Sequence, residues 1–342
     1  MKSRRAFTLI ELLVVVAIIG LLISIMLPSL GRARATARAV KCGAQINSVG
    51  KAVAGYLTEN SGFYPPSYWY PNADGSYDFM NQPSAHPYGY AHWSFFLFNY
   101  AKDLKAFTCP EFITGGLSRT NPGPNGGYWT SGQFDQNGAT GPSGNSLEDR
   151  QAPFMAFTAN ATIVPRNKFT VPIAQADGGS GDRLNTFVRQ SSLKNESGII
   201  LMTEFNANWQ TITAVDSNGR TVLKTHRPIS PYIGAGGGTD EYNFPLNGQL
   251  ARTSVSDLYD KDTLTAKENS GASLITDQQT QLNAVGRHHP GTYAANGRSY
   301  GGTTNFIYAD GHVERKNIAQ TIIGWEWGDT YYSLTGNTSI RN

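Results

Sequence analysis

Two adjacent histidines and an aspartate near the C-terminus are the residues whose types most suggest chemistry. His288 and His289 stand together, and Asp310 is followed by Gly311 and His312. Two imidazoles and a carboxylate could bind zinc or exchange protons if folding brought them together. An Asp-Gly pair is, however, more often a plain hairpin turn, and a histidine before proline is commonly a loop residue. We therefore expect no catalytic residue and no metal site here.

Other candidate ligand sites have weaker patterns. The run from Asp177 to Asp182 could hold calcium, but it lacks the alternating ligands and closing glutamate of an EF-hand loop, which favours a turn. Six aromatic residues could stack on sugars or hold irregular loops together: Tyr68, Trp69, Tyr70, Tyr88, Tyr90 and Trp129. Because the chain has no nucleophile elbow, zinc-protease helix motif or phosphate-binding loop, we expect it not to be an enzyme.

A long apolar run near the N-terminus must position the rest of the chain. Between Phe7 and Leu27 the only ionisable residue is Glu11. A helix over this run would be roughly 30 Å long, the thickness of the hydrocarbon core of a bilayer. Basic residues both precede and follow the run, so charge does not fix its orientation. An acid inside such a run is costly in lipid, which makes Glu11 a candidate functional residue.

The helix is expected to continue beyond the apolar run. Pro28 would break or kink it, because proline removes one hydrogen bond and crowds the preceding turn. Apolar residues then recur at intervals of three and four: Leu30, Ala33, Ala37, Val40, Ala44, Ile46, Val49, Val53 and Leu57. The pattern stops near Gly62, a good helix terminator. We predict a helix of roughly 80 Å, apolar all round in its first half and amphipathic in its second.

Two cysteines, Cys42 and Cys109, are the only ones in the sequence. Their wide spacing fits no zinc or redox motif. In an oxidising compartment beyond a membrane span, an even count suggests one disulfide, which would pin the end of the long helix to the body. Two separate buried thiols are the alternative.

Composition indicates a folded, turn-rich domain after the helix. The chain has 37 Gly and 17 Pro, with 11% aromatic and 15% charged residues. Its net charge of +3 leaves no basic face that would indicate nucleic acid. We predict a buried strand at 198–203, a hairpin pairing 209–215 with 221–225, a short helix at 91–100 and a long loop at 115–144.

The first residues resemble the amino terminus of type IV pilins and type II secretion pseudopilins. The shared pattern is a short basic leader, a small residue, and then Phe-Thr-Leu-Ile-Glu-Leu from residue 7. The resemblance implies cleavage between Ala6 and Phe7 by prepilin peptidase and N-methylation of Phe7. The family usually has Gly where this chain has Ala6, which bears on the efficiency of cleavage more than on identity. It also implies that Glu11 pairs with the terminal amine of a neighbouring subunit.

Two other interpretations of the N-terminus stay open. An ordinary signal peptide could be cut after small residues at 33–35 or 35–37, although the length of the run and the acid within it argue against this. A membrane anchor that is never processed would show the same apolar run.

Further segments resemble the prepilin-like proteins abundant in planctomycetes, which end in an H-X9-DG motif. Here 21 and 20 residues separate His288 and His289 from the Asp310-Gly311 pair, instead of nine. An insertion within 292–302 would explain the longer spacing, and it leaves open whether either histidine reaches the Asp-Gly turn. Around that turn the resemblance implies strand, turn and strand.

The sequence therefore predicts an α+β protein whose long pilin-like helix packs on a loop-rich antiparallel β-sheet domain. Its parts are a leader (1–6), a transmembrane and filament-core helix (7–27), an amphipathic continuation (28–60) and a β-rich periplasmic or extracellular domain (61–342). We expect a single-pass inner-membrane protein that becomes a pilus or pseudopilus subunit. Its partners would be other subunits, prepilin peptidase, the assembly platform and the lipid bilayer, with no nucleic acid and no cofactor apart from possible calcium. The alternatives are a surface adhesin or glycan-binding protein and, third, an anchored hydrolase.

Overall fold

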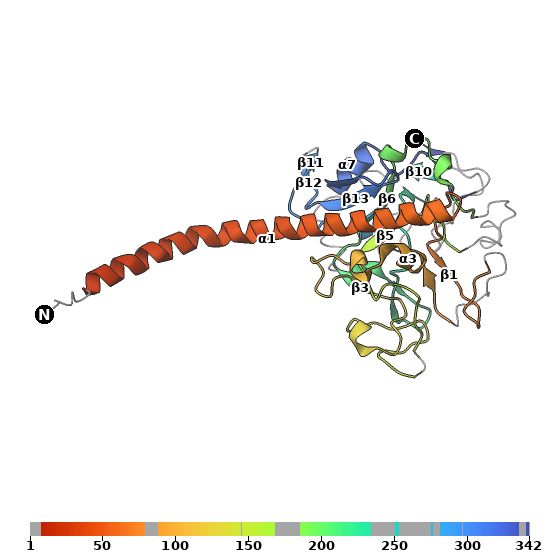
Figure 1. Cartoon of the computed structure of the whole chain (residues 1–342), viewed down its shortest axis with the longest axis horizontal. Helices are drawn as coiled ribbons and strands as arrows, with labels where there is room; N and C mark the ends of the chain where they lie inside the picture. The colour runs from red at the N-terminus through yellow and green to blue at the C-terminus, as the bar shows by residue number, and fades with distance from the viewer. Residues whose placement is uncertain are drawn as a thin grey trace.

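One long helix dominates the molecule. The computed structural model describes residues 8–78, 88–144, 146–167, 185–233, 250–252, 275, 281–295, 297–334 and 340–341. Helix α1 (Leu9–Glu59) spans 51 residues, and its N-terminal half projects far beyond a globular, loop-rich domain (Figure 1). The α+β architecture predicted from the sequence is therefore correct.

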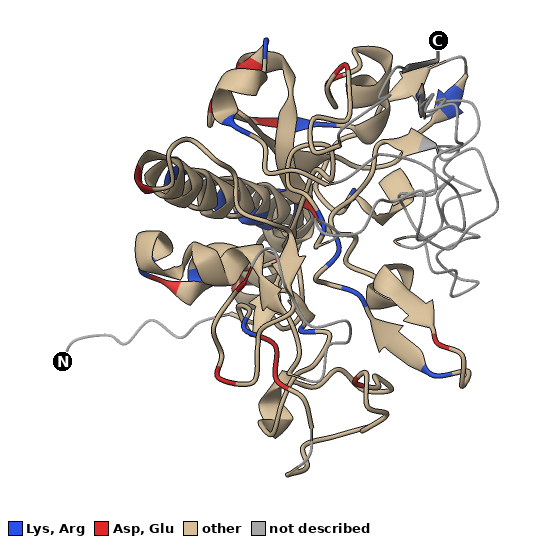
Figure 2. Ribbon diagram, turned by 90° about the vertical axis from the view of Figure 1, so that its right-hand side faces the viewer, with Lys and Arg blue, Asp and Glu red and all other residues tan. Residues whose placement is uncertain are grey.

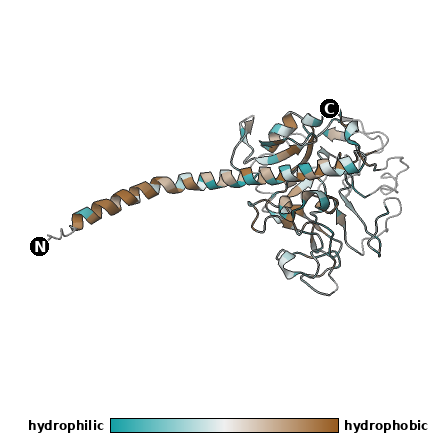
Figure 3. Cartoon of the chain, viewed as in Figure 1, coloured by the Kyte–Doolittle hydropathy of each residue, from teal (hydrophilic) through white to brown (hydrophobic). Residues whose placement is uncertain are grey.

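The two halves of α1 have different surroundings. Every described residue before position 35 is exposed, and the residues as far as Leu27 are almost all hydrophobic, as the brown colouring of the ribbon in Figure 3 shows. From residue 39 onward one face of the helix is buried against the domain: Ala39, Cys42, Ile46, Val49, Gly50, Ala52, Val53 and Leu57. The helix thus belongs to the domain core only in its second half.

The amphipathic stripe begins later than predicted. Leu30 and Val40 are 47% and 64% exposed, and Ala33, Ala37 and Ala44 are also exposed. The prediction was wrong at the three alanines because alanine suits either face of a helix, so their spacing did not identify the packed side. It was wrong at Leu30 because no residue of α1 before Ala39 is buried, and at Val40 because that residue lies about 100° around the helix from Ala39. The later members Ile46, Val49, Val53 and Leu57 are buried as predicted.

Helix α1 continues through Pro28 without a break, and Figure 1 shows its projecting half gently curved. Of the two outcomes predicted for Pro28, a break or a kink, the break is therefore absent. The helix ends where expected, with Asn60 as C-cap. The backbone N–H of Gly62 donates to the carbonyl of Leu57 at 2.8 Å. Gly62 adopts a φ of +78°, a left-handed conformation that closes helices well.

A four-stranded antiparallel sheet forms the centre of the domain, in the order β14-β13-β6-β5. Its strands are β5 (Phe157–Ala159), β6 (Ile200–Glu204), β13 (Thr304–Tyr308) and β14 (Val313–Lys316). The packed half of α1 lies against β13 and β14. The closeness is clear at Gly50, where an added Cβ would lie 2.0 Å from Cδ1 of Ile307 in β13.

The remaining strands form short sheets around this centre. They are β1 (Tyr68–Trp69) with β2 (Ala91–His92), β3 (Leu117–Ser118) with β4 (Phe154–Met155), β7 (Thr213–Val215) with β8 (Thr221–Leu223), β11 (Ala294–Ala295) with β12 (Arg298–Ser299), and β10 (Leu250–Arg252) between β9 (Tyr232–Ile233) and β15 (Ile340–Arg341). The short helices are α2 (Trp93–Phe96), α3 (Phe98–Ala101), α7 (Ile318–Ile323) and the 3-10 turns η1 (Leu104–Phe107), η2 (Gly126–Tyr128), η3 (Gln190–Ser192), η4 (Glu196–Gly198), η5 (Trp209–Ile212) and η7 (Gln281–Ala284).

Local predictions were right in kind and wrong at several ends. The strand predicted at 198–203 is β6. The hairpin forms around the Asn218-Gly219 pair, but its first strand is shorter than predicted because 209–212 form η5. The helix predicted at 91–100 begins two residues late, since 91–92 pair with β1, and it divides into α2 and α3. The loop at 115–144 contains only the short β3 and η2 among its described residues.

A disulfide between Cys42 and Cys109 joins α1 to the segment after η1, with a Cα–Cα distance of 4.9 Å. Nearby, Nε of Arg38 on α1 lies 2.9 Å from Oε1 of Glu111. The packed half of the helix is therefore attached to the domain by a covalent bond as well as by apolar contacts. Charged residues of both signs are spread over the domain (Figure 2).

Candidate functional site

The described part of the N-terminal motif begins with a helix cap. The Thr8 hydroxyl donates to Oε2 of Glu11 at 2.7 Å, and the Thr8 backbone N–H donates to the same oxygen at 2.8 Å. The Glu11 N–H in turn donates to the Thr8 hydroxyl at 3.3 Å, completing a capping box. The predicted cleavage site, Ala6 and Phe7, lies outside the described residues. In the single chain, Glu11 is thus held by its own helix terminus.

The projecting half of α1 is apolar enough and long enough to cross a membrane. Its large side chains are about half or more exposed: Leu9, Ile10, Leu12, Leu13, Val14, Val15, Val16, Ile18, Ile19, Leu21, Leu22, Ile23, Ile25, Met26 and Leu27. No part of the described domain covers them. Such a surface is stable only when lipid or other protein removes it from water.

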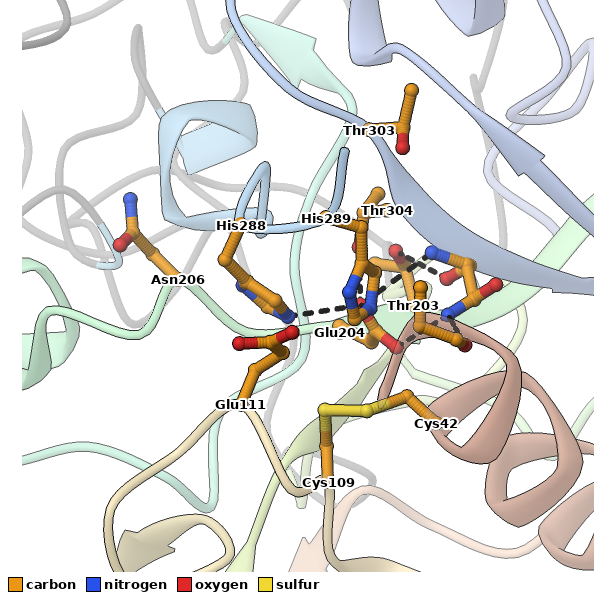
Figure 4. A network of polar contacts seen from close by, with 12 residues as sticks. Cys42, Cys109, Glu111, Thr203, Glu204, Asn206, His288, His289, Thr303 and Thr304 are labelled. Carbon is orange, nitrogen blue, oxygen red and sulfur yellow. Dashed lines mark hydrogen bonds and ion pairs between the residues drawn. A yellow bond between two sulfur atoms is a disulfide. The ribbon is translucent and has the colours of Figure 1, made fainter. Parts of the chain in front are cut away.

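A second site lies inside the domain, where both predicted histidines meet an acid that the sequence analysis missed. Nε2 of His288 and Nε2 of His289 lie 3.1 and 2.7 Å from Oε2 of Glu204 (Figure 4). Glu204 ends β6, and both histidines follow η7 in the sequence. Glu204 and His289 are buried at 0% and 2% exposure. The sequence did show that Glu204 ends a largely apolar predicted strand, which could have marked it as a candidate. Nothing in the sequence identified its partners.

Hydrogen bonds from β13 complete the surroundings of Glu204. The Thr304 hydroxyl donates to Oε2 at 2.8 Å, and the Asn305 amide donates to Oε1 at 2.8 Å. The same amide lies 3.3 Å from the carbonyl of Ala39, which connects the cluster to α1. Burial opposes ionisation of the carboxyl most strongly, but the hydrogen bonds and charges of His288 and His289 outweigh it and hold the pKa of Glu204 well below its usual range.

Asp310 and Gly311 are not part of this cluster. They form the turn between β13 and β14, as the resemblance implied, and Gly311 has a φ of +92°. The Asp310 carboxylate accepts from the His312 N–H at 3.1 Å and lies 2.6 Å from Nδ1 of the same residue. Thr304 and Asp310 flank β13 at opposite ends, roughly 15 Å apart at the rise of a strand. The histidines therefore contact Glu204 and not the Asp-Gly turn.

The longer spacing before Asp310 is occupied by the β11–β12 hairpin, within the predicted insertion at 292–302. Just after it, the backbones of His289 and Thr303 exchange hydrogen bonds of 3.0 and 3.1 Å. This pairing returns the chain to the start of β13. The hairpin can thus be accommodated without displacing His289 from the cluster.

The disulfide lies beside the cluster. One ligand atom from each of Cys42, Cys109, Glu204 and His289 lies within 4.8 Å of the other three, and all four residues are buried. Figure 4 shows these four side chains from α1, the segment after η1, β6 and the segment after η7 facing one another. The arrangement is therefore a convergence of potential metal ligands from four distant parts of the chain.

Most of the aromatic residues considered for sugar binding pack inside the domain. Tyr68, Trp69 and Tyr90 are at most 3% exposed, and the Tyr90 ring stacks on His226 at 4.1 Å. Tyr70 packs near Tyr90, with ring centroids 5.6 Å apart, and the Trp129 indole donates to the carbonyl of Gly123. Tyr88 is 47% exposed. The run from Asp177 to Asp182 lies outside the described residues.

A comparison with known families bears on the N-terminus alone. Residues 1–27 match the prokaryotic N-terminal methylation motif. The chain begins with a type IV pilin-like signal. The match covers the leader and the apolar run that starts α1, and it supports processing by prepilin peptidase as for pilin-like precursors in general. No curated protein and no solved structure matched the chain.

Proposed function

We propose that this pilin-like precursor is a structural subunit of a type IV pilus or a type II secretion pseudopilus. The exposed apolar half of α1, directly after a methylation motif, is the observation that carries the proposal. The chain would first be held in the inner membrane by this half, with its domain in the periplasm. Prepilin peptidase would cut between Ala6 and Phe7 and methylate the new amine, and the assembly platform would then transfer the subunit into a filament. Its role is assembly, without catalysis.

The hydrophobic effect supports both stages. Each large aliphatic side chain that leaves water contributes on the order of 2 kcal/mol. Lipid supplies this burial for the single subunit, and the same half-helices of neighbouring subunits supply it in a filament. Since the domain contacts only the second half of α1, the first half remains available to other chains.

Glu11 has the chemistry to set the register between subunits. In the single chain its carboxylate is satisfied by Thr8. Inside an apolar bundle, a carboxylate needs a cationic partner, because an unpaired charge costs several kcal/mol there. Cleavage before Phe7 creates such a partner, a terminal amine that can approach Glu11 of a neighbouring subunit.

Mass spectrometry of the mature N-terminus tests processing. A chain beginning at N-methylated Phe7 is the expected result. A chain that keeps Met1, or one that begins at Thr36 or Arg38 after an ordinary signal-peptide cut, would contradict the proposal.

Filament incorporation of Glu11 variants tests the register role. Glu11→Ala and Glu11→Gln should both lower incorporation at least tenfold while the domain unfolds at the unchanged temperature. Thr8→Ala is the matched control, because it removes the cap and leaves the acid, and it should assemble nearly normally. Full assembly of Glu11→Gln would refute the charge pairing.

One surface feature favours a second candidate, a filament-borne binding protein. A cavity of about 350 Å³ is lined by Lys194, Arg252, Trp325 and Tyr332 among others. The Arg252 guanidinium lies 5.0 Å from the centre of the Trp325 ring. Aromatic faces beside cations suit acidic sugars. Binding of the full chain to a glycan array, lost in Trp325→Ala, would support this candidate, and a blank array with abundant filaments would count against it.

A further inference from the structure

We propose that Cys42, Cys109, Glu204 and His289 bind one Zn²⁺ ion while the two cysteines are thiols, and that formation of the disulfide expels the ion. The site lies against the packed half of α1, away from the projecting apolar half, and the proposal does not depend on filament formation. It departs from the sequence-based expectation that the chain holds no metal.

The positions of the ligand atoms carry the proposal. In a tetrahedral zinc site, bonds of about 2.0–2.3 Å place ligand atoms about 3.3–3.8 Å apart. The four atoms here already lie within 4.8 Å of one another. Breaking the sulfur–sulfur bond would let the two sulfurs move apart to zinc spacing. The largest separation of 4.8 Å exceeds zinc spacing by about 1 Å, which is the shift that the other two ligands would need.

The kinds of ligand fit zinc better than other common cations. Zinc is bound by thiolate, imidazole and carboxylate groups, whereas calcium and magnesium prefer oxygen ligands alone. With four protein ligands and 0–2% exposure of each residue, the coordination sphere would be complete and closed to water. Such closed sites are structural and not catalytic.

The surroundings would hold these ligands in place. The Asn305 amide contacts Oε1 of Glu204 and would keep hold of the carboxylate while Oε2, which His289 now contacts, bound the metal in place of that contact. The Thr304 hydroxyl and His288 also contact the carboxylate and would orient it. In the described part of the chain, Nδ1 of His289 is buried without a hydrogen-bond partner, an arrangement that calls for an explanation. The explanation that we propose is that the imidazole of His289 binds the metal ion, which is present only in the reduced protein.

The reduced state needs no added reductant, because every cysteine is synthesised as a thiol. Zinc would then join α1 to the loop after η1 and to β6 before the disulfide exists. An external disulfide compound would oxidise the site: the two thiolates give up two electrons and form the Cys42–Cys109 bond. The oxidant is reduced to two thiolates, and Zn²⁺ leaves. Metal and disulfide therefore replace each other at the same place in the fold.

Cobalt substitution of the full-length chain in detergent tests the site. The protein is reduced with a phosphine, freed of reductant without oxygen, and titrated with Co²⁺. We expect one ion per chain, thiolate-to-cobalt charge-transfer absorption, and the visible bands of tetrahedral cobalt, all abolished by one equivalent of Zn²⁺. The oxidised form of the same chain should show none of these bands. Absence of the charge-transfer band in the reduced wild type would overturn the proposal, whatever any variant does.

Variants then assign the ligands. Cys42→Ser should weaken the charge-transfer band, and Glu204→Gln and His289→Gln should each weaken Co²⁺ binding at least tenfold. His312→Ala is the matched control, since His312 is an exposed histidine in an acid pair outside the cluster, and it should bind as the wild type does. Unchanged binding in both Glu204→Gln and His289→Gln would reject this ligand set.

Discussion

The two halves of α1 belong to the same helix but have different surroundings. The second half is part of the domain core, where Cys42, Ile46 and Val49 are fully buried. The first half is apolar on all sides and has no contact with the domain. The comparison teaches that one half of the helix is part of the folded domain, whereas the other half presents an apolar surface that the described domain does not cover.

A charge introduced into each half should reveal the largest difference in domain stability between the two halves. Ile46→Asp places an unpaired carboxylate in the core and should destabilise the domain by about 5 kcal/mol. Ile18→Asp is its matched control, because Ile18 is 52% exposed, and it should leave domain unfolding unchanged. It should instead lower membrane insertion by about 3 kcal/mol. Denaturant unfolding in detergent measures the first effect. Equal destabilisation by both variants would refute the division of α1.

The disulfide should account for the next largest effect on the packed half. Cys42 and Cys109 are 67 positions apart, and a loop of this size gives about 4 kcal/mol in the chain-entropy model. The double variant Cys42→Ser with Cys109→Ser should therefore lose about 4 kcal/mol of unfolding free energy, measured with a metal chelator present. The accessibility of the projecting half to a membrane-restricted label should stay the same. A loss below about 1 kcal/mol would show that packing alone attaches the helix.

The sequence predicted α1 well because its signals are local. These signals are a run that is almost entirely apolar, then an apolar stripe along one face, and then Gly62 at the end. Each can be recognised from residues close together in the sequence. The same reasoning failed where neighbouring residues do not show which face of the helix packs on the domain. Alanines at 33, 37 and 44 were assigned to the packed face, and only the position of the sheet shows that contact begins at Ala39.

The buried cluster could be predicted only in part, because its members come together through the tertiary fold. His288 and His289 were identified as candidates, but their partner Glu204 is more than 80 positions away. The sequence offered Asp310 as the candidate acid, and β13 places it at the far end of the strand. An acid at the end of a strand is ordinarily solvated, so the sequence pattern gave no reason to expect that Glu204 is buried in the core.

Acid should weaken the cluster that holds the packed half. The pKa of Glu204 is lowered in the folded state, so its contribution is fully present above the unfolded value of about 4.3, declines as the pH falls below that value, and is lost only when the pH has fallen through the lowered pKa of the folded state. We expect Glu204→Gln to cost about 2 kcal/mol at pH 7 in the oxidised protein, and progressively less as the pH falls below about 4. Asp310→Asn, in an exposed histidine pair, should cost less than about 1 kcal/mol at pH 7. A Glu204→Gln cost that does not vary with pH would contradict the assignment.

Two glycines give the smallest and sharpest test, because the same substitution falls in each half of one helix. Alanine is favoured over glycine in a helix by about 1 kcal/mol. At Gly50 the new Cβ would lie 2.0 Å from Ile307 Cδ1 in the core, so the side chain must shift at a cost of about 1–3 kcal/mol. Gly50→Ala should therefore lower domain stability by about 1 kcal/mol net. At Gly31 an added Cβ would meet nothing within 4 Å apart from the neighbouring helix backbone, so Gly31→Ala should leave domain unfolding unchanged and raise helix content. Thermal unfolding followed by near- and far-ultraviolet circular dichroism separates the two results. If Gly50→Ala were stabilising, the contact between α1 and β13 would have to be looser than the structure has it.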